Sequence, residues 1–149
     1  MGFILKGMIE MFRFLLNLVL FQIYVLDAAR RLRVYPLPVV LFRTGTTHRA
    51  GYFPYLLIAV NPYKLRGLTI KQIEEAARHE MRHHWQTLRH GDVCQWWRSH
   101  RDIYKRYYFC RLNWMEEDAR RFSHWDEEAS PACPQTVEKL EDWYQRGLL

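Results

Sequence analysis

Residues 69–90 have the sequence TIKQIEEAARHEMRHHWQTLRH, and this stretch is the strongest indication of the fold. Its apolar residues recur at helical spacing, which predicts a helix from Ile70 to His90. Thr69 followed three residues later by Gln72 predicts a capping box at the start of this helix. His90-Gly91 predicts its end, because glycine commonly follows the last turn of a helix.

Within this helix, His79-Glu80-Met81-Arg82-His83 is the part that points to chemistry. Histidines four residues apart project from the same side of a helix, about 5.4 Å apart along its axis, so both rings can reach one metal ion. The glutamate between them is placed to hold a metal-bound water, as in zinc-dependent peptidases. Since so short a motif also arises by chance, it needs a helix, a preceding strand and a third ligand to support it.

A projection of the helix at about 100° per residue separates three faces. The apolar face, expected to lie on a sheet, consists of Ile70, Ile73, Ala77, Met81, His84 and Leu88. The face expected to be solvated consists of Lys71, Glu74, Glu75, Arg78, Arg82 and Arg89. His79 and His83 share a third face with Gln72, Ala76 and Gln86, and Glu80 lies between this face and the apolar one. His84 is expected to be packed or hydrogen-bonded rather than to bind metal.

Three short apolar runs before the helix predict strands at Val39–Phe42, at 51–53 and at 55–60. The sequence therefore predicts an α+β fold, with a small, mostly antiparallel sheet of about three strands and the motif helix packed on it. The last strand, near Leu56 to Val60, could offer its edge to an extended substrate.

The N-terminal segment predicts a further helix. Its apolar run from Phe14 to Leu26 is shorter than the ~20 residues that a membrane span needs, and Asp27 occupies the place where a signal peptide would be cleaved. A helical repeat predicts a buried stripe that consists of Phe12, Leu15, Leu16, Val19, Ile23 and Leu26. We expect a core helix that ends in the basic run Arg30, Arg31, Arg33 before Pro36, with a membrane-surface helix as the alternative.

A third ligand has to come from downstream, and the candidates are His90, His100, Glu116, Glu117, Asp118 and His124. The segment from Tyr104 to Trp125 predicts one helix with a buried stripe that consists of Tyr108, Leu112, Met115, Ala119 and Phe122. Glu116 and Asp118 lie on the two shoulders of that stripe, where a carboxylate needs a partner such as a metal ion, and Glu117 points away from it. A salt bridge to Arg111 or Arg120 is the alternative, so the residues alone leave Glu116, Asp118, His90 and His124 open.

A capped helix with His-Glu-x-x-His, followed by a helix with Glu116-x-x-Ala119-x-x-Phe122-Ser123, resembles the minimal gluzincin metallopeptidases. The similarity is greatest to the ImmA/IrrE-like family and covers about residues 38–125. It implies a zincin-like fold, a zinc ion held by His79, His83 and Glu116, and a protein substrate such as a DNA-binding regulator. Arg120 stands where gluzincins usually carry an aspartate or asparagine that steadies a ligand histidine. The SprT-like peptidases are a neighbouring family, in which a histidine followed by glycine is the third ligand. His90-Gly91 would be the matching pair in this chain.

The resemblance also implies a mechanism for hydrolysis of a peptide bond. Glu80 would take a proton from the zinc-bound water and return it to the leaving amine. The oxyanion that forms needs a hydrogen-bond donor, and Tyr104, Tyr107, Tyr108 and His124 are the candidates.

Length and charge set the remaining expectations. The 149 residues suit one domain, divided into an N-terminal helix (1–35), a catalytic core (38–125) and a C-terminal helix (131–149) that covers Thr136 to Arg146. Asp126-Glu127-Glu128 is expected to be a solvated loop. Three cysteines, Cys94, Cys110 and Cys133, contain no CxxC pair, which favours a reducing, cytoplasmic setting.

The net charge of +6 and the pI near 9.4 leave a second class of function open. A basic chain rich in aromatic residues could instead be a non-catalytic protein that binds nucleic acid or a regulatory partner. A membrane surface is the less expected partner.

Overall fold

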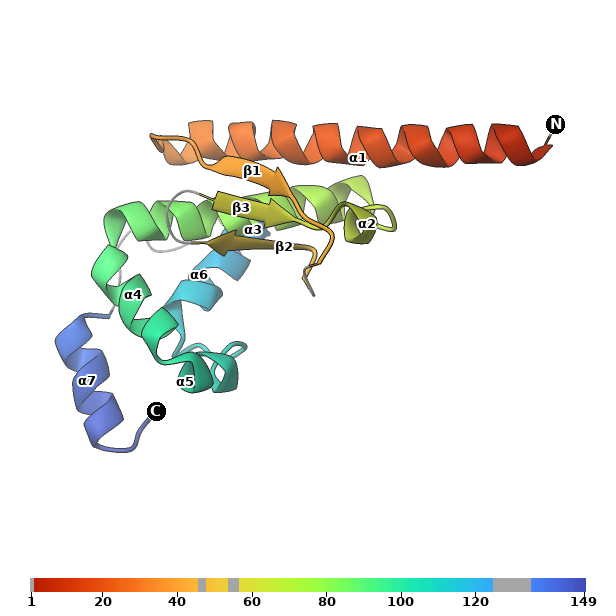
Figure 1. The fold of residues 1–149 in the computed structure, drawn as a ribbon. Coiled ribbons are helices and arrows are strands. Elements are labelled where there is room, and N and C mark those ends of the chain that lie inside the picture. The colour runs from red at the N-terminus through yellow and green to blue at the C-terminus, as the bar shows by residue number, and fades with distance from the viewer. Residues whose placement is uncertain (1, 46–47, 54–56, 125–134) are drawn as a thin grey trace.

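The computed structural model describes residues 2–45, 48–53, 57–124 and 135–149, and its architecture is α+β as predicted (Figure 1). In chain order the elements are α1 Gly2–Leu32, β1 Val39–Phe42, β2 Ala50–Phe53, β3 Leu57–Val60, α2 Pro62–Leu65, α3 Ile70–Arg89, α4 Gly91–Ser99, α5 Arg101–Arg106, α6 Trp114–Ser123 and α7 Val137–Gln145. The predictions for Tyr55, Leu56, Trp125, Asp126-Glu127-Glu128 and 131–134 fall outside the described residues.

The three strands form one mixed sheet in the order β1-β3-β2. β1 runs parallel to β3, with Val39 opposite Leu57, and β2 runs antiparallel to β3, with Phe53 opposite Leu57. The central strand is the most buried, since Ile58 and Val60 have no exposed surface. The prediction that β3 offers a free edge is wrong, because both of its sides are already hydrogen-bonded to neighbouring strands. The edges of this sheet are β1 and β2.

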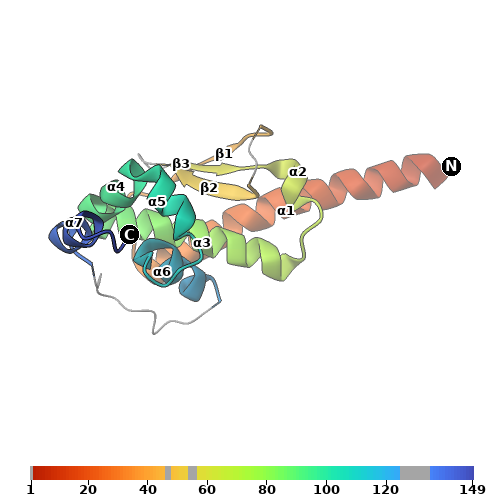
Figure 2. The same ribbon diagram turned by 90° about the horizontal axis from the view of Figure 1, so that it is seen from below.

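Helix α3 begins and ends where the sequence predicts. The Thr69 hydroxyl accepts from the Gln72 backbone N–H at 3.2 Å, and the Gln72 side chain accepts from the Thr69 N–H at 3.0 Å, which completes the capping box. His90 closes the helix, its N–H donating to the Gln86 carbonyl. Helices α3 and α1 lie on the same side of the sheet (Figure 2), so the motif helix is held between the sheet and its neighbouring helices.

The apolar face of α3 packs largely as expected. Ile73, Ala77 and Met81 are fully buried in the main core, together with Phe21 of α1 and Ile58 of β3. His84 is also buried, and its ring bonds to the Pro36 carbonyl (2.7 Å) and the Tyr52 hydroxyl (3.2 Å), as expected for a packed histidine. Ile70 and Leu88, at the two ends of the stripe, are exposed.

The expected solvated side of α3 is wrong at two positions. Arg78 and Arg82 are 1% and 5% exposed, because α6 packs on this side of the helix. Arg78 donates to the Phe122 carbonyl near the end of α6, and Arg82 pairs with Asp118 in its middle. Polar side chains can therefore face a neighbouring helix when that helix supplies acceptors.

The predicted buried stripe of α1 is also wrong. Its residues are exposed, among them Phe12 (69%), Val19 (55%) and Leu26 (53%). The buried face is the opposite one, which consists of Asn17, Phe21, Val25, Ala28 and Ala29. The helix is apolar on both sides, so a helical repeat can be drawn along either side and does not show which one packs.

The segment predicted as one helix from Tyr104 to Trp125 contains two. α5 ends at Arg106, turns follow, and α6 begins at Trp114 with Asn113 as its N-cap, whose side chain accepts from the Glu116 N–H at 3.3 Å. This break aims α6 back at α3, as Figure 2 shows. Neither α2 nor α4 was predicted from the sequence.

The C-terminal helix begins after the Thr136 cap and ends before Gly147, whose φ of 67° suits glycine. Leu140 anchors α7 in a second core cluster with α4 and α6, in which Trp97 and Met115 are buried. Among the described residues, neither Cys94, which is buried, nor Cys110 forms a disulfide bond.

Candidate metal centre

Three side chains from two helices converge at one point between α3 and α6. His79 and His83 lie on successive turns of α3, and their Nε2 atoms are 3.1 Å apart. Glu116, in the first turn of α6, places Oε2 3.3 Å from His79 Nε2 and Oε1 3.3 Å from His83 Nε2. The potential ligand atoms of these three residues all lie within 4.8 Å of one another. The structure therefore brings together the three residues that the family resemblance implies as ligands.

This arrangement fits a tetrahedral metal ion. Zinc binds histidine nitrogen and carboxylate oxygen at about 2.0–2.2 Å, so two ligand atoms of a tetrahedral site lie about 3.3–3.5 Å apart. The two histidine nitrogens are 3.1 Å apart, and each lies 3.3 Å from one oxygen of the Glu116 carboxylate, close to that value. Glu116 is 1% exposed, and within the described part of the chain its Oε2 has the His79 ring at 3.3 Å but no partner with hydrogen-bond geometry. A buried carboxylate oxygen without such a bond is costly, and a bound cation would satisfy it.

Opposite charges on His83 and Glu116 stabilise the arrangement of these side chains. Burial lowers the pKa of His83, but the negative charge of Glu116 outweighs burial and raises that pKa to about 9. Burial likewise raises the pKa of Glu116, whereas the adjacent His83 and His79 rings hold it well below its usual range. The carboxylate is thus ionised and ready to bind a cation, which would replace the proton on His83.

Gln86 orients His83. Its side chain is fully buried, and its Nε2 donates both to the Met115 carbonyl (2.8 Å) and to Asp118 Oδ2 (2.7 Å). Its Oε1 therefore faces His83 Nδ1, at 2.8 Å, and accepts the hydrogen carried there. In the neutral ring this leaves the lone pair of Nε2 directed at the site. An amide on α3 thus holds one of the two histidines in its orientation.

Asp118 extends this support to α6. It accepts two buried hydrogen bonds from Arg82, at 2.7 and 2.9 Å, and the Arg82 guanidinium lies 3.9 Å from the centre of the Trp85 ring. Because Asp118 is two residues from Glu116, this paired contact fixes the rotation of α6 that presents Glu116 to the histidines. Arg120, which the resemblance marks as a departure, points elsewhere and donates to the Tyr108 carbonyl.

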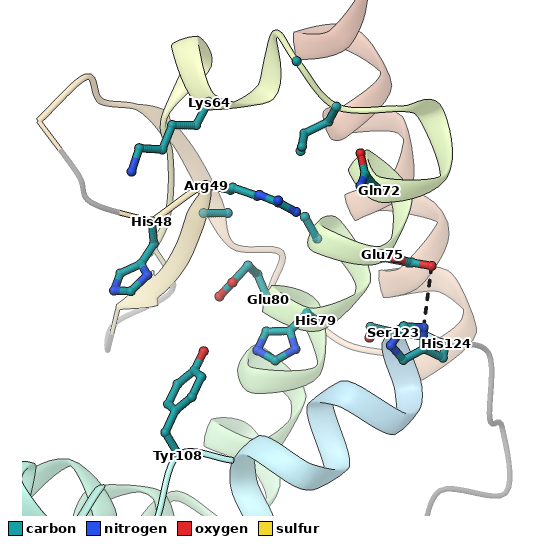
Figure 3. A pocket seen from close by; sticks show the side chains of 14 residues that line it. His48, Arg49, Lys64, Gln72, Glu75, His79, Glu80, Tyr108, Ser123 and His124 are labelled. Atoms are coloured by element: carbon teal, nitrogen blue, oxygen red, sulfur yellow. Dashed lines mark ion pairs between the residues drawn. The ribbon is translucent and has the colours of Figure 1, made fainter. Parts of the chain in front are cut away.

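Two tyrosines from the segment between α4 and α6, Tyr104 and Tyr108, lie beside the three potential ligands. The Tyr104 hydroxyl donates to Glu116 Oε1, so it supports the carboxylate. Burial and the charges of Glu116 and Glu80 raise the pKa of Tyr108 to about 12, so its hydroxyl stays protonated at neutral pH. Figure 3 shows this hydroxyl pointing toward Glu80 and His79, where it can donate a hydrogen bond.

The site opens into a cleft of about 630 Å³. Glu80 and His79 lie on its floor, and Glu80 is 7% exposed with its carboxylate turned into the cleft (Figure 3). The walls come from the segment that leads into β2, from α2 and the segment after it, from α3 and from the end of α6. They include His48, Arg49, Ala50, Lys64, Leu68, Gln72, Glu75, Ser123 and His124. The edge strand β2 thus borders the cleft.

The other candidate ligands lie outside the group of three. Asp118 is occupied by Arg82 and Gln86, and the His90 ring packs against Trp85 and Trp114. The remaining three are also engaged elsewhere: His100 stacks on Trp96, His124 lies at the rim of the cleft, 3.6 Å from Glu75, and Glu117 pairs with Arg120 at 3.3 Å. Of the candidate oxyanion donors, Tyr107 bonds to the Leu148 carbonyl in the second core cluster, away from the cleft.

Comparisons of the chain with protein-family models, curated proteins and solved structures found no match. The chemistry of the site is therefore inferred from its own residues. The helical projection places Gln86 on the same face as the two histidines, but its role was not predicted from the sequence. A polar residue three positions after a ligand histidine, on the same face, was the signal for that role.

The role of Gln86 leads to a prediction. We expect Gln86→Met to weaken zinc binding by about 10–100-fold, because the His83 ring loses the acceptor that fixes its orientation. Zinc affinity is measured by competition with a chromogenic chelator. Gln95→Met, on the exposed side of α4, is the matched control and should leave the affinity unchanged. Equal affinities of the two variants would contradict the role of Gln86.

Proposed function

We propose that this chain is a zinc-dependent endopeptidase that uses His79, His83 and Glu116 as metal ligands and Glu80 as the general base. The observation that carries the proposal is the convergence of two imidazole nitrogens and a buried carboxylate at a point where His79 and a second carboxylate, Glu80, line a cleft. Two histidines and one glutamate are a ligand set typical of catalytic zinc, which keeps a further position open for water or substrate.

The protein groups divide the work of peptide hydrolysis. A zinc ion bound there would polarise the substrate carbonyl and lower the pKa of a water molecule. Glu80, whose carboxylate faces the cleft, accepts a proton from the attacking water and returns it to the leaving amine. Tyr108 donates a hydrogen bond to the oxyanion, for which its raised pKa keeps the proton in place. Tyr104 and Gln86 hold the ligands Glu116 and His83 in position.

The cleft suits an extended polypeptide. β2 is an edge strand, and its first residue, Ala50, lines the cleft next to Arg49. An extended peptide can add to such an edge through backbone hydrogen bonds, which presents a peptide bond to the floor of the cleft. A protein substrate is therefore favoured over a small molecule, and a DNA-binding regulator is the substrate class implied by the ImmA/IrrE resemblance.

A non-catalytic nucleic-acid-binding function is less well supported. Two of the arginines that contribute to the positive charge, Arg78 and Arg82, are buried and bond to α6. Arg98 and Arg120 also make internal hydrogen bonds, to Thr87 and to the Tyr108 carbonyl. These four side chains make contacts inside the protein and are not available to form a phosphate-binding surface.

The proposal is tested by zinc titration of paired variants at adjacent positions. Glu116→Gln should lower zinc affinity by at least about 100-fold, because it replaces an ionised ligand by a neutral amide. Glu117→Gln, one residue along and one-third exposed, should bind one equivalent of zinc like the unmodified chain. Isothermal titration calorimetry on the metal-free proteins gives both values. A Glu116→Gln protein that binds zinc as tightly as the control would refute the ligand set.

A further inference from the structure

The outer side of α1 is a continuous apolar stripe. It runs from Leu5 to Leu26, about 32 Å at 1.5 Å per residue, and occupies about 120° of the helix circumference without a charged residue. All of its members are exposed, Phe12 at 69% and Leu16, the least exposed, at 42%; they are Leu5, Met8, Ile9, Phe12, Leu15, Leu16, Val19, Ile23 and Leu26. Isolated exposed apolar side chains are ordinary, but a contiguous stripe of this length marks an interaction surface.

The opposite side of the same helix belongs to the folded body. Phe21 and Val25 are buried in the main core, and Asn17 donates to the Leu65 carbonyl at 2.9 Å. Nearer the N-terminus, Arg66 of the segment after α2 donates to Glu10 at 2.9 Å. The inner side of the helix is thus bound to the folded body. A partner that binds the outer side has to approach from solvent.

By length and composition α1 is apolar enough to cross a membrane, and only 17% of its most apolar 18-residue window is buried. A spanning position would pull Glu10 and Asn17 away from Arg66 and Leu65, to which they are bonded. An orientation parallel to a membrane surface keeps these contacts and buries the stripe.

The exposed side chains at the N-terminal tip of α1 favour a bilayer over a second copy of the chain as the partner of the stripe. The first turns of α1 extend beyond the body of the protein (Figure 1). There Phe3 (95% exposed) lies on the side of the helix opposite the stripe, and Ile4 and Met11 lie just beyond the edge of the stripe. A partner helix that packs along the stripe would leave these side chains in water, whereas the interfacial region of a bilayer can surround the tip.

Charge and aromatic residues near the helix agree with a lipid surface. Basic residues outnumber acidic ones four to two within α1, and both acidic ones, Glu10 and Asp27, are paired with arginines. Tyr63 of α2, two-thirds exposed, packs against Phe14 beside the helix. Positive charge and amphipathic aromatic rings are what the headgroup region of an anionic membrane attracts.

We propose that α1 docks the protein on an anionic lipid bilayer, with the helix in the plane of the interface and its outer stripe among the acyl chains. The stripe supplies the apolar area, and the basic residues contact the headgroups. β2 is the strand farthest from α1 in Figure 1, so docking through α1 leaves the edge strand and its cleft accessible. The inference does not depend on the identity of the metal or on peptidase activity.

Vesicle flotation of the full chain tests this inference. The probe is vesicles of phosphatidylcholine containing a minority of phosphatidylglycerol. We expect the unmodified protein to float with the vesicles and the double variant Phe12→Glu, Val19→Glu to show a partition coefficient at least about tenfold lower. Phe109→Glu is the matched control, since Phe109 is 84% exposed on a segment away from α1, and it should bind like the unmodified chain.

Circular dichroism and zinc affinity report whether the double variant retains its fold, which is expected because both residues are exposed. Three outcomes would overturn the inference. One is an unmodified protein that stays with the buffer, and another is vesicle binding that is equal in the double variant. The third is a concentration-dependent dimer, seen by analytical ultracentrifugation and lost in the double variant, in a protein that does not bind vesicles; it would assign the stripe to a second copy.

Discussion

Replacing Glu80 by glutamine is expected to lower peptide hydrolysis by about 10²–10⁴-fold, since the amide cannot accept the proton that the attacking water gives up. Glu80 is adjacent to His79 on α3 and is not in the group of potential metal ligands, so zinc affinity should stay close to that of the unmodified chain. Hydrolysis is measured on a peptide library by the appearance of new termini in mass spectrometry, a readout that works whatever the natural substrate is.

Glu75→Gln is the matched control for this prediction. Glu75 lies on the same helix and lines the same cleft, but its carboxylate is turned to His124 and Lys71 (Figure 3). The control should hydrolyse the library at the rate of the unmodified chain. If the Glu80 variant kept full activity while the chain bound zinc, the metal site would stand but the assignment of the general base would fail.

Replacing Arg82 by methionine is expected to lower the free energy of unfolding by about 3–5 kcal/mol. The substitution keeps an apolar stem against the Trp85 ring but leaves the buried Asp118 carboxylate without its cationic partner. That is a large share of the roughly 5–15 kcal/mol that stabilises a typical domain. Urea denaturation followed by tryptophan fluorescence measures the change.

Two further variants show whether the effect comes from the buried pair. Arg82→Met combined with Asp118→Leu should recover most of the lost stability, because no buried charge is then left alone. Arg146→Met, which removes the partner of Asp142 in an exposed pair, should cost less than about 1 kcal/mol. A loss in Arg82→Met as small as in Arg146→Met would show that the pair between α3 and α6 contributes little.

The parts of the fold that sequence analysis predicted correctly depend on local interactions. The capping box at Thr69 and Gln72 involves neighbouring residues, as does the break at His90, so the limits of α3 follow from the chain alone. The four-residue spacing of His79 and His83 likewise fixes their common direction.

The errors concern contacts between elements. Nothing in the local sequence shows that Arg78 and Arg82 would face α6, because their acceptors at Phe122 and Asp118 lie about forty residues away. The same holds for α1, where two apolar sides compete and only the packed structure shows that Phe21 is inside and Phe12 outside.

The position of the third ligand depends both on the local sequence and on contacts between elements. Residue type and helical spacing left Glu116, Asp118, His90 and His124 open, and the family resemblance chose Glu116. In the structure Asn113 begins a new helix and Arg82 engages Asp118, so Glu116 lies opposite the two histidines. A single helix through residues 104–125, as the periodicity predicts, has no break at Asn113 to turn Glu116 toward α3.

The most direct test of the central claim is hydrolysis of the peptide library by the metal-depleted chain before and after one equivalent of zinc is returned. The account predicts no new termini from the metal-free protein and their appearance on addition of zinc, but not in the Glu116→Gln variant at the same zinc concentration. Cleavage that persists without metal would contradict it. So would a zinc-loaded, folded protein that produces no new termini from the library.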